Sequence, residues 1–214
     1  MEYIHNTEQF QFHNTVVALG KFDGMHKGHQ LIFDELIQYK QLGYQAAVFS
    51  FDRPPLNMLK HKHMRVIYTT NEKIKLLARR GIDIYIEHPF TDEFSHLSPE
   101  DFVIKVLLEK TGMKVLVVGD DCGFGYKRQG NVELLERMSK EYDFKLIVIP
   151  KLELEGEIVS STRIRHLLSE GKVEEANRLM EDPFMICGSV VHGNHMGAEV
   201  LQMPTANQIP LEDK

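Results

Sequence analysis

The sequence predicts an α/β fold in which a parallel sheet is flanked by helices and followed by a short β segment. Short apolar runs rich in Val and Ile alternate along the chain with amphipathic helical patterns. A glycine-rich turn joins the first apolar run to the first helical pattern. Alternation of this kind places the strands parallel, with helices on both faces of the sheet.

The predicted strands cover residues 15–19, 45–51, 82–86, 114–118 and 144–149. Helical patterns separate them over residues 29–41, 71–80, 99–110 and 131–141. Good N-cap residues mark three helix starts, namely Asn71, Ser98 ahead of Pro99, and Asn131. Glycines mark three helix ends, at Gly43, Gly81 and Gly112.

The pattern changes after residue 149. Ser161 and Thr162 are expected to cap a helix that runs to about Leu168, and a second short helix is expected over residues 173–180. A strand-like stretch then follows Pro183. We therefore expect one domain of residues 1–183 and an incomplete β segment of residues 184–214, which is too short to fold alone.

The composition of the chain argues against several classes of function. The chain has 214 residues, of which 43% are hydrophobic and 26% charged, so a packed core is expected. A net charge of −6 argues against general nucleic-acid binding and against an anionic membrane surface. No apolar run is long enough to cross a bilayer, and Cys122 and Cys187 lack metal-type spacing. We expect a soluble, cytoplasmic protein with reduced thiols.

The turn of residues 20–29 reads Gly-Lys-Phe-Asp-Gly-Met-His-Lys-Gly-His. Its glycines let backbone N–H groups approach an anion, and the helix that follows adds partial positive charge. His26 and His29 lie one helical turn apart and can face the same phosphate. The alternatives are a surface histidine pair or half of a zinc site. Asp23 either caps the turn or shapes a nucleotide pocket.

A second anion site is predicted at residues 159–165, which read Val-Ser-Ser-Thr-Arg-Ile-Arg. Hydroxyl groups at a helix N-terminus, with an arginine one turn further on, are typical of phosphate binding. The alternative is an ordinary Ser/Thr cap followed by a solvated arginine.

Two more loops follow predicted strands. In residues 118–127, the glycines allow a ligand to come close, and Phe124 either stacks on that ligand or is a buried anchor. Cys122 is interpreted as a small apolar filler. In residues 49–55, Asp52 and Arg53 either contact a substrate or only shape the loop. The scattered histidines lack metal-ligand spacing and are expected to be exposed, namely His61, His63, His88 and His96.

Together, the two phosphate motifs resemble those of the nucleotidyltransferase superfamily. The form Gly-x-Phe-Asp-Gly-x-His-x-Gly-His is similar to its FAD synthetase branch, and nearly the whole chain resembles the bifunctional riboflavin kinase/FAD synthetase family. The resemblance implies a Rossmann-like nucleotidyltransferase fold. It also implies that FMN is adenylylated with Mg²⁺-ATP to give FAD and pyrophosphate, with ATP and FMN as the partners.

The resemblance also implies roles for residues. The catalytic set is His26, His29 and Arg165, with both histidines on the α-phosphate. The ATP-binding set is Gly20, Phe22, Asp23, Gly24, Gly28, Ser161 and Thr162. The FMN-binding set is Phe51, Asp52, Gly119, Asp121 and Phe124. No metal ligand from the protein is implied, because Mg²⁺ enters with ATP.

The chain departs from the family pattern in three places. Cys122 stands where the family usually has phenylalanine, and Arg53 and Pro54 replace a Pro-His pair in the loop that borders the flavin side. Residues 188–193 and 204–207 resemble the opening of a kinase-type β-barrel. However, residues 198–203 replace both glycines and the arginine expected there. We therefore expect FMN adenylyltransferase activity without riboflavin kinase activity.

Two other functions are compatible with these motifs. One is nucleotidyl transfer to another phosphorylated acceptor, because the phosphate motifs are shared across the superfamily. The other is a non-catalytic flavin or nucleotide sensor. The retained His26, His29, Ser161 and Arg165 favour the enzyme. The pattern indicates no particular oligomeric state.

Overall fold

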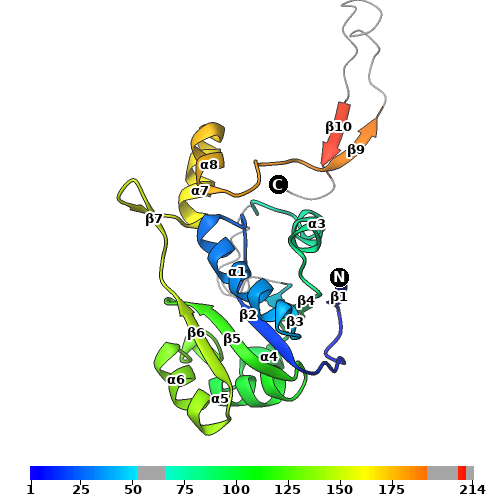
Figure 1. Cartoon of the computed structure of the whole chain (residues 1–214). Coiled ribbons are helices and arrows are strands. Elements are labelled where there is room, and N and C mark those ends of the chain that lie inside the picture. Colours follow the sequence, from blue (N-terminus) through cyan, green and yellow to red (C-terminus); the bar gives the residue numbers. More distant parts are fainter. Residues whose placement is uncertain (53–65, 192–206, 211–214) are drawn as a thin grey trace, which may run out of the picture.

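A parallel six-stranded sheet forms the centre of the computed structural model, which describes residues 1–52, 66–191 and 207–210 (Figure 1). The strand order is β1-β4-β3-β2-β5-β6, and neighbouring strands pair in parallel. Their bounds are Glu2–His5 (β1), Thr15–Leu19 (β2), Gln45–Phe51 (β3), Ile84–His88 (β4), Met113–Gly119 (β5) and Lys145–Ile149 (β6). This sheet confirms the predicted fold class.

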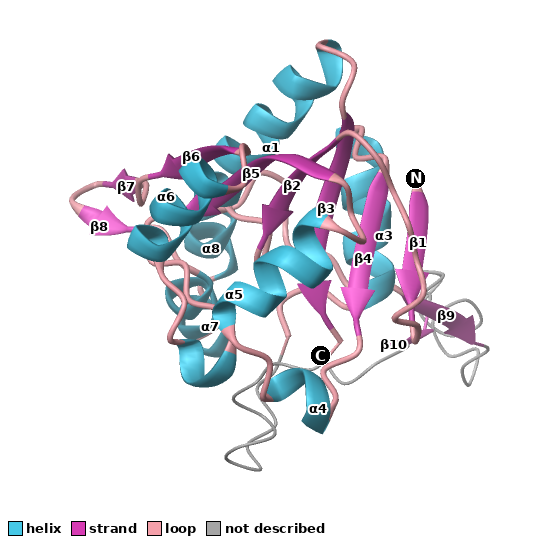
Figure 2. Ribbon diagram, turned by 90° about the horizontal axis from the view of Figure 1, so that it is seen from below, coloured by secondary structure: helices cyan, strands magenta, loops and turns pink. Residues whose placement is uncertain are grey.

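Helices cover both faces of the sheet (Figure 2). Val16 and Ala18 of β2 face one core cluster, whereas Val17 and Leu19 face the other. The first cluster is covered by α1 (Lys27–Gln41), α3 (Thr70–Arg80), α7 (Ser161–Ser169) and α8 (Val173–Leu179). The second is covered by the π-helical segment η1 (Phe102–Leu108), which follows the short helix α5 (Pro99–Asp101), and by α6 (Val132–Glu141). A strand buried on both faces needs apolar residues at every position, which explains the continuous runs.

Two strands on one side of the sheet, β1 and β4, differ from the strands predicted from the sequence. Strand β1 was not predicted, because its four residues lack an apolar run and its only partner in the sheet is β4. Strand β4 also begins two residues later than expected. Asp83 lies in the turn before it, where its carboxylate accepts hydrogen bonds from Lys40 and from the Ala46 N–H.

Two predicted helix caps were wrong. Helix α3 is capped by Thr69, which forms a reciprocal capping box with Glu72, so Asn71 lies inside the helix. Helix α7 is capped by Ser160, whose side chain accepts from the Arg163 N–H. Ser161 and Thr162 are therefore its first two helical residues. The predicted caps Ser98 and Asn131 are confirmed.

The expectation that His88 is exposed was wrong. His88 is only 1% exposed and packs against the rings of Phe49 and Phe94. Burial lowers its pKa. His96 is exposed as expected. His61 and His63 lie outside the described residues.

The remaining elements are short. They are α4 (Asp92–Ser95), the 3₁₀ turn η2 (Tyr126–Arg128), the hairpin of β7 (Glu153–Leu154) and β8 (Glu157–Ile158), and the antiparallel pair of β9 (Gly188–Val191) and β10 (Asn207–Pro210). Figure 1 shows β9 and β10 projecting away from the sheet. The altered motif of residues 198–203 and the loop after Asp52 lie outside the described residues. Over the described ranges, no helix is long and apolar enough to cross a membrane.

Candidate functional site

The candidate site lies at the carboxyl ends of β2 and β5. These strands are neighbours in the sheet, although the chain runs through β3 and β4 between them. Such a point, where the strand order reverses, is where open parallel sheets bind ligands. Gly20 directly follows β2 and Gly119 ends β5. The turn of residues 20–29 and the loop of residues 118–127 therefore lie on either side of this point.

The nucleotide turn, defined here as residues 20–29, has an unusual backbone. Phe22 and Met25 adopt left-handed φ angles of 50° and 38°, and Gly24 has a φ of 81°. A Cβ at Gly24 would lie 2.8 Å from the Ile67 side chain. Left-handed backbone at residues other than glycine is strained and persists only where neighbouring contacts hold it. One such contact is the Gln30 amide, which donates to the Met25 carbonyl at 2.8 Å.

His26 and His29 are brought together as predicted. Their rings stack with centroids 3.6 Å apart, and the Phe22 ring meets His29 edge-on at 5.1 Å. His26 is also the N-cap of α1, since its Nδ1 accepts from the His29 N–H at 3.3 Å. Nδ1 of His29 is buried and has no hydrogen-bond partner in the described part of the chain. The packing rules out a solvated surface pair.

Both histidines are neutral at neutral pH. Burial lowers the pKa of His26 to about 4, although the nearby Asp23 carboxylate acts in the opposite direction. Burial, and then the neighbouring His26, lower the pKa of His29 well below its usual value. A neutral imidazole still has one N–H to donate. The pair can thus offer hydrogen bonds to a phosphate without first gaining a proton.

Asp23 joins the first two motifs. Its carbonyl accepts from the Ser161 hydroxyl at 2.5 Å, and its Oδ2 pairs with the Arg165 guanidinium at 2.6 Å. Its Oδ1 accepts from the backbone N–H groups of Ile67 and Tyr68 at 3.0 and 3.3 Å. Asp23 therefore does more than cap a local turn, because it holds α7 and the segment before α3 against the nucleotide turn.

The other residues of the second motif have different surroundings. Thr162 is exposed on the first turn of α7. Arg163 pairs with Glu157 of β8 at 2.6 Å, and its Nη1 is buried with no partner among the described residues. Ser161 and Arg165 thus face the nucleotide turn, whereas Arg163 faces the β7–β8 hairpin.

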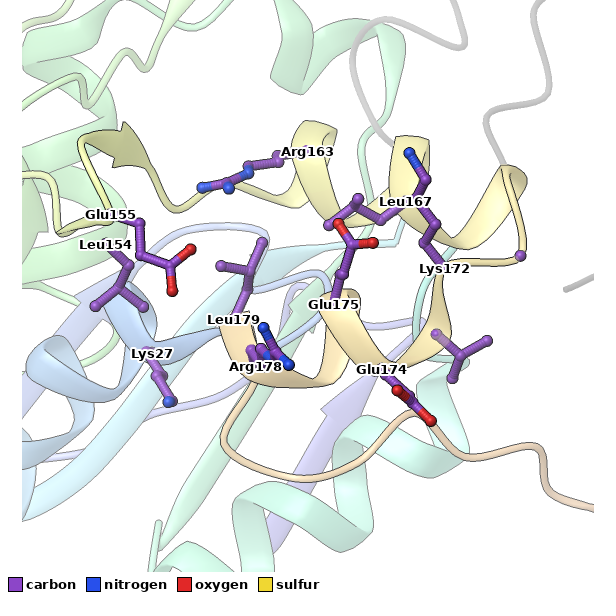
Figure 3. A pocket seen from close by; sticks show the side chains of 12 residues that line it. Lys27, Leu154, Glu155, Arg163, Leu167, Lys172, Glu174, Glu175, Arg178 and Leu179 are labelled. Atoms are coloured by element: carbon purple, nitrogen blue, oxygen red, sulfur yellow. The ribbon is translucent and has the colours of Figure 1, made fainter.

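A cavity of about 800 Å³ lies beside the nucleotide turn, between α7, α8 and the β7–β8 hairpin (Figure 3). Lys27, the first residue of α1, and Arg163 line it on the side of the two phosphate motifs. Figure 3 shows acidic side chains among its basic ones, with Glu155 and Glu175 on opposite sides. Of the residues in the predicted motifs, Lys27 and Arg163 line this cavity.

Phe51 and Asp52 lie at the carboxyl end of β3. Phe51 is half-buried and belongs to a group of rings that includes Phe49 and Phe94. The Asp52 carboxylate accepts from the Phe90 N–H at 2.9 Å. This hydrogen bond favours the interpretation that Asp52 shapes the loop. Arg53 lies outside the described residues.

The loop after β5 contains the other predicted flavin-side residues. Phe124 is 5% exposed and packs on Phe102 at 5.8 Å, which is the arrangement of a buried anchor. Asp121 is exposed and pairs with Lys151 at 3.2 Å. Burial raises the pKa of the Cys122 thiol to about 11, so it is an unreactive filler. Phe102 links Phe51 and Phe124, because its ring packs against both.

Sequence reasoning missed several residues of the site. Burial, together with the positive charges of Arg128 and Arg165, lowers the pKa of Lys21. Lys21 is thus close enough to Arg128 and Arg165 to be affected by their charges. Ile67, Tyr68 and Met180 support the nucleotide turn from distant parts of the chain. No motif could have identified these three, since their contacts are long-range.

The chain is similar to known proteins over most of its length. Residues 8–163 match the model of the FAD synthetase family. The chain is 39% identical over 207 residues to a bifunctional riboflavin kinase/FMN adenylyltransferase of Buchnera aphidicola subsp. Schizaphis graminum, covering 95% of this chain and 66% of that protein. It is 32% identical to an FAD synthetase of Listeria monocytogenes, covering 88% of this chain and 77% of that protein.

A solved structure has the same fold. The crystal structure of a macrolide-efflux protein from Streptococcus pneumoniae matches with a TM-score of 0.85 and 30% identity, covering 99% of this chain and 69% of that one. The six-stranded sheet and its helices thus form an α/β nucleotidyltransferase-like fold. The chain spans about two thirds of the length of the bifunctional relatives.

Proposed function

The chain belongs to the FAD synthetase family, and we propose that it transfers the adenylyl group of ATP to FMN, giving FAD and pyrophosphate. One observation carries this proposal most strongly. Asp23 contacts both Ser161 and Arg165, which are the proposed phosphate-binding residues. The stacked pair of His26 and His29 belongs to the same turn as Asp23. Two anion sites held together in this way suit a triphosphate that bends across them.

In the proposed reaction, a phosphate oxygen of FMN attacks the α-phosphorus of ATP. A new P–O bond forms, the bond between the α-phosphorus and the bridging oxygen breaks, and pyrophosphate leaves with those electrons. The attacking group is already an anion, so no general base is needed. Negative charge accumulates on the equatorial oxygens of the α-phosphate in the transition state. We propose that the N–H groups of His26 and His29 stabilise that charge.

The second motif holds the rest of the triphosphate. The N-terminal turn of α7 offers backbone N–H groups and the exposed Thr162 hydroxyl to the β- and γ-phosphates, while Ser161 adds its position on that turn and ties it to Asp23 through its hydroxyl. Arg165 adds a positive charge, and its ion pair with Asp23 fixes its direction. This arrangement contributes mainly by orienting the leaving group in line with the attacking phosphate.

Mg²⁺ is proposed to arrive as part of the substrate, bound to the triphosphate oxygens. In the parts of the chain that the structure describes, no three His, Cys, Asp or Glu side chains cluster in a way that could hold a metal ion. The Asp23 carboxylate, at the centre of the site, already accepts hydrogen bonds from Arg165 and two backbone N–H groups. Asp23 therefore has a structural role in the site, and we do not assign it as a metal ligand.

FMN is proposed to bind across the carboxyl ends of β3 and β5. Phe51 presents a half-buried ring there, and Gly119 allows the substrate to come close to the backbone. Asp52, Asp121 and Phe124 complete the proposed flavin side. We also propose a cytoplasmic setting, because Cys122 and Cys187 are both free thiols.

Product analysis by chromatography tests the proposal. The protein is incubated with Mg²⁺-ATP and either FMN or riboflavin. FAD from FMN, with no product from riboflavin, is the expected result. FMN or FAD from riboflavin would contradict the expected lack of kinase activity. Bound ATP without any product would point to another phosphorylated acceptor or to a sensor.

A further inference from the structure

The chain that leaves α8, residues 180–187, runs past α3 toward β9, and we call it the connector (Figure 1). It begins on the nucleotide turn itself, because Met180 forms an isolated antiparallel β-bridge with His26. Met180 is 2% exposed and belongs to the same core cluster as Phe22 and Met25. The connector thus touches the backbone of a proposed catalytic residue.

Tyr68 links the connector to the other side of the turn. Its hydroxyl donates to the carbonyls of Asp182 and Pro183, at 3.1 and 3.4 Å. Its backbone N–H donates to the Asp23 carboxylate at 3.3 Å. One residue, itself 1% exposed, therefore contacts both the connector and the carboxylate that pairs with Arg165.

Three further contacts fasten the connector. The Phe184 N–H donates to the Asn177 side chain, and the Cys187 N–H donates to the Glu72 carboxylate, both at 2.8 Å. Asp182 also pairs with Arg79. Glu72 is fully buried and at the same time caps α3 through the Thr69 N–H at 2.9 Å. Burying a carboxylate is costly unless it accepts such hydrogen bonds, so these contacts define one position for the connector.

The nucleotide turn needs support of this kind. Phe22 and Met25 hold left-handed backbone without being glycine, and such strained conformations persist only where the surrounding structure enforces them. The connector is one of those surroundings, since it bridges His26, the residue after Met25. A connector that shifts would let the turn relax and move the imidazoles away from the α-phosphate.

We propose that the connector is a positioning element for the nucleotide turn, and that Tyr68 is the positioning residue that couples the two. The effect on catalysis rests on the proposed function. The effect on the turn itself does not, because it depends only on the contact of Met180 with His26 and on those of Tyr68 with Asp23 and the connector. Residues after the connector would thereby influence adenylyl transfer without touching its substrates.

The test compares Tyr68→Phe with Tyr85→Phe. Tyr85 is also 1% exposed, and its hydroxyl donates to Glu87 at 3.1 Å, far in sequence from the connector. In Tyr68→Phe we expect amide hydrogen exchange in residues 22–29 to accelerate about tenfold, because opening the connector exposes the turn. We expect kcat for FAD formation to fall about tenfold with KM for ATP changed less than about twofold, because a small displacement of a catalytic group affects chemistry most.

The outcomes separate the two proposals. Equal exchange in Tyr68→Phe and Tyr85→Phe would overturn the role of the connector, even if the wild type makes FAD. Faster exchange in Tyr68→Phe alone, in a protein that makes no FAD, would support the connector and contradict the proposed function. An unchanged kcat in Tyr68→Phe, with wild-type FAD formation, would also overturn the positioning role.

Asn177 provides a second pair of variants, should Tyr68→Phe fold poorly. Asn177 is only half-buried, so its substitution should not unfold the chain. Asn177→Ala removes the acceptor for the Phe184 N–H and is expected to accelerate exchange in residues 22–29. Asn177→Asp keeps an oxygen at that position and should restore the wild-type rate. Identical behaviour of the two Asn177 variants would overturn the proposal.

Discussion

The nucleotide turn and the flavin-side loops lie at the same edge of one sheet but are held by different forces. Buried polar contacts hold the turn, as Asp23 alone binds Ser161, Arg165 and two backbone N–H groups. Aromatic packing holds the flavin side, where Phe51 and Phe124 both rest on Phe102. Polar geometry is specific in distance and angle, whereas ring packing adapts to substitution.

We infer from this contrast that the two sides have different roles. The chemistry of transfer depends on groups placed within a few tenths of an ångström, so it belongs on the rigid, polar side. Recognition of the acceptor depends on apolar area and can change by repacking. We therefore expect substitutions in the turn to affect turnover strongly and substitutions on the flavin side to affect FMN affinity modestly.

The largest effect is expected for His29→Ala. Turnover should fall on the order of a hundredfold or more, because a donor to the charged α-phosphate is lost. The dissociation constant for ATP should rise less than about fivefold, since Ser161, Thr162 and Arg165 remain. Steady-state kinetics and calorimetric titration with ATP measure the two quantities. His96→Ala, which alters an exposed histidine, is the control and should leave both unchanged.

A smaller loss is expected for Asp23→Asn. Arg165 loses its charged partner, and we expect turnover to fall roughly thirtyfold, since positioning effects of this kind are typically below a hundredfold. The free energy of unfolding should fall by about 3 kcal/mol, the usual cost of breaking a mostly buried ion pair.

Urea unfolding and FAD formation are measured on the same Asp23→Asn preparation. The matched control is Asp34→Asn, which breaks the more exposed pair with Arg80 and should cost less than about 1 kcal/mol. Equal losses of stability in both variants would mean that Asp23 has no special structural role.

On the flavin side, Phe51→Leu is expected to raise the dissociation constant for FMN about fivefold, because a stacking partner is replaced by an aliphatic group. Affinity for ATP should not change. Quenching of flavin fluorescence measures the first and calorimetry the second. A loss of ATP affinity equal to the loss of FMN affinity would show that the two sides of the site are not separate.

The smallest effect concerns pH. The folded state holds His26 neutral down to a pKa of about 4, whereas the unfolded chain protonates it near pH 6.5. Because the unfolded state binds more protons in this window, stability falls as pH falls from about 6.5 to 4. Between pH 7 and 5.5 we expect a loss of about 1 kcal/mol from His26.

His29 and His88 contribute to the loss of stability with the same sign, because burial lowers both of their pKa values. The check is urea unfolding at each pH for the wild type and for His26→Gln. The variant should show a shallower dependence on pH. An identical slope in both proteins would mean that His26 is not held neutral by the fold.

Local patterns were enough to predict most of the sheet and helices. Strands buried on both faces, such as β2 and β5, show as continuous apolar runs, and glycines mark helix ends such as Gly81, the left-handed C-cap of α3. The edge strand β1 and the cap Thr69 escaped prediction. A short edge strand has a weak pattern, and neighbouring Thr, Thr and Asn residues compete equally for one cap.

Residue spacing is sufficient to predict which chemical groups the site offers: two histidines one turn apart, a Ser-Thr-x-x-Arg helix start, and glycines after β2 and β5. Each of these groups lies within one element or its adjoining turn, so local sequence specifies it. Long-range packing, in contrast, establishes that Asp23 joins the motifs, that His88 is buried, and that Met180 and Tyr68 support the turn. Those contacts join residues distant in sequence, and packing selects them only when the sheet and its helices come together.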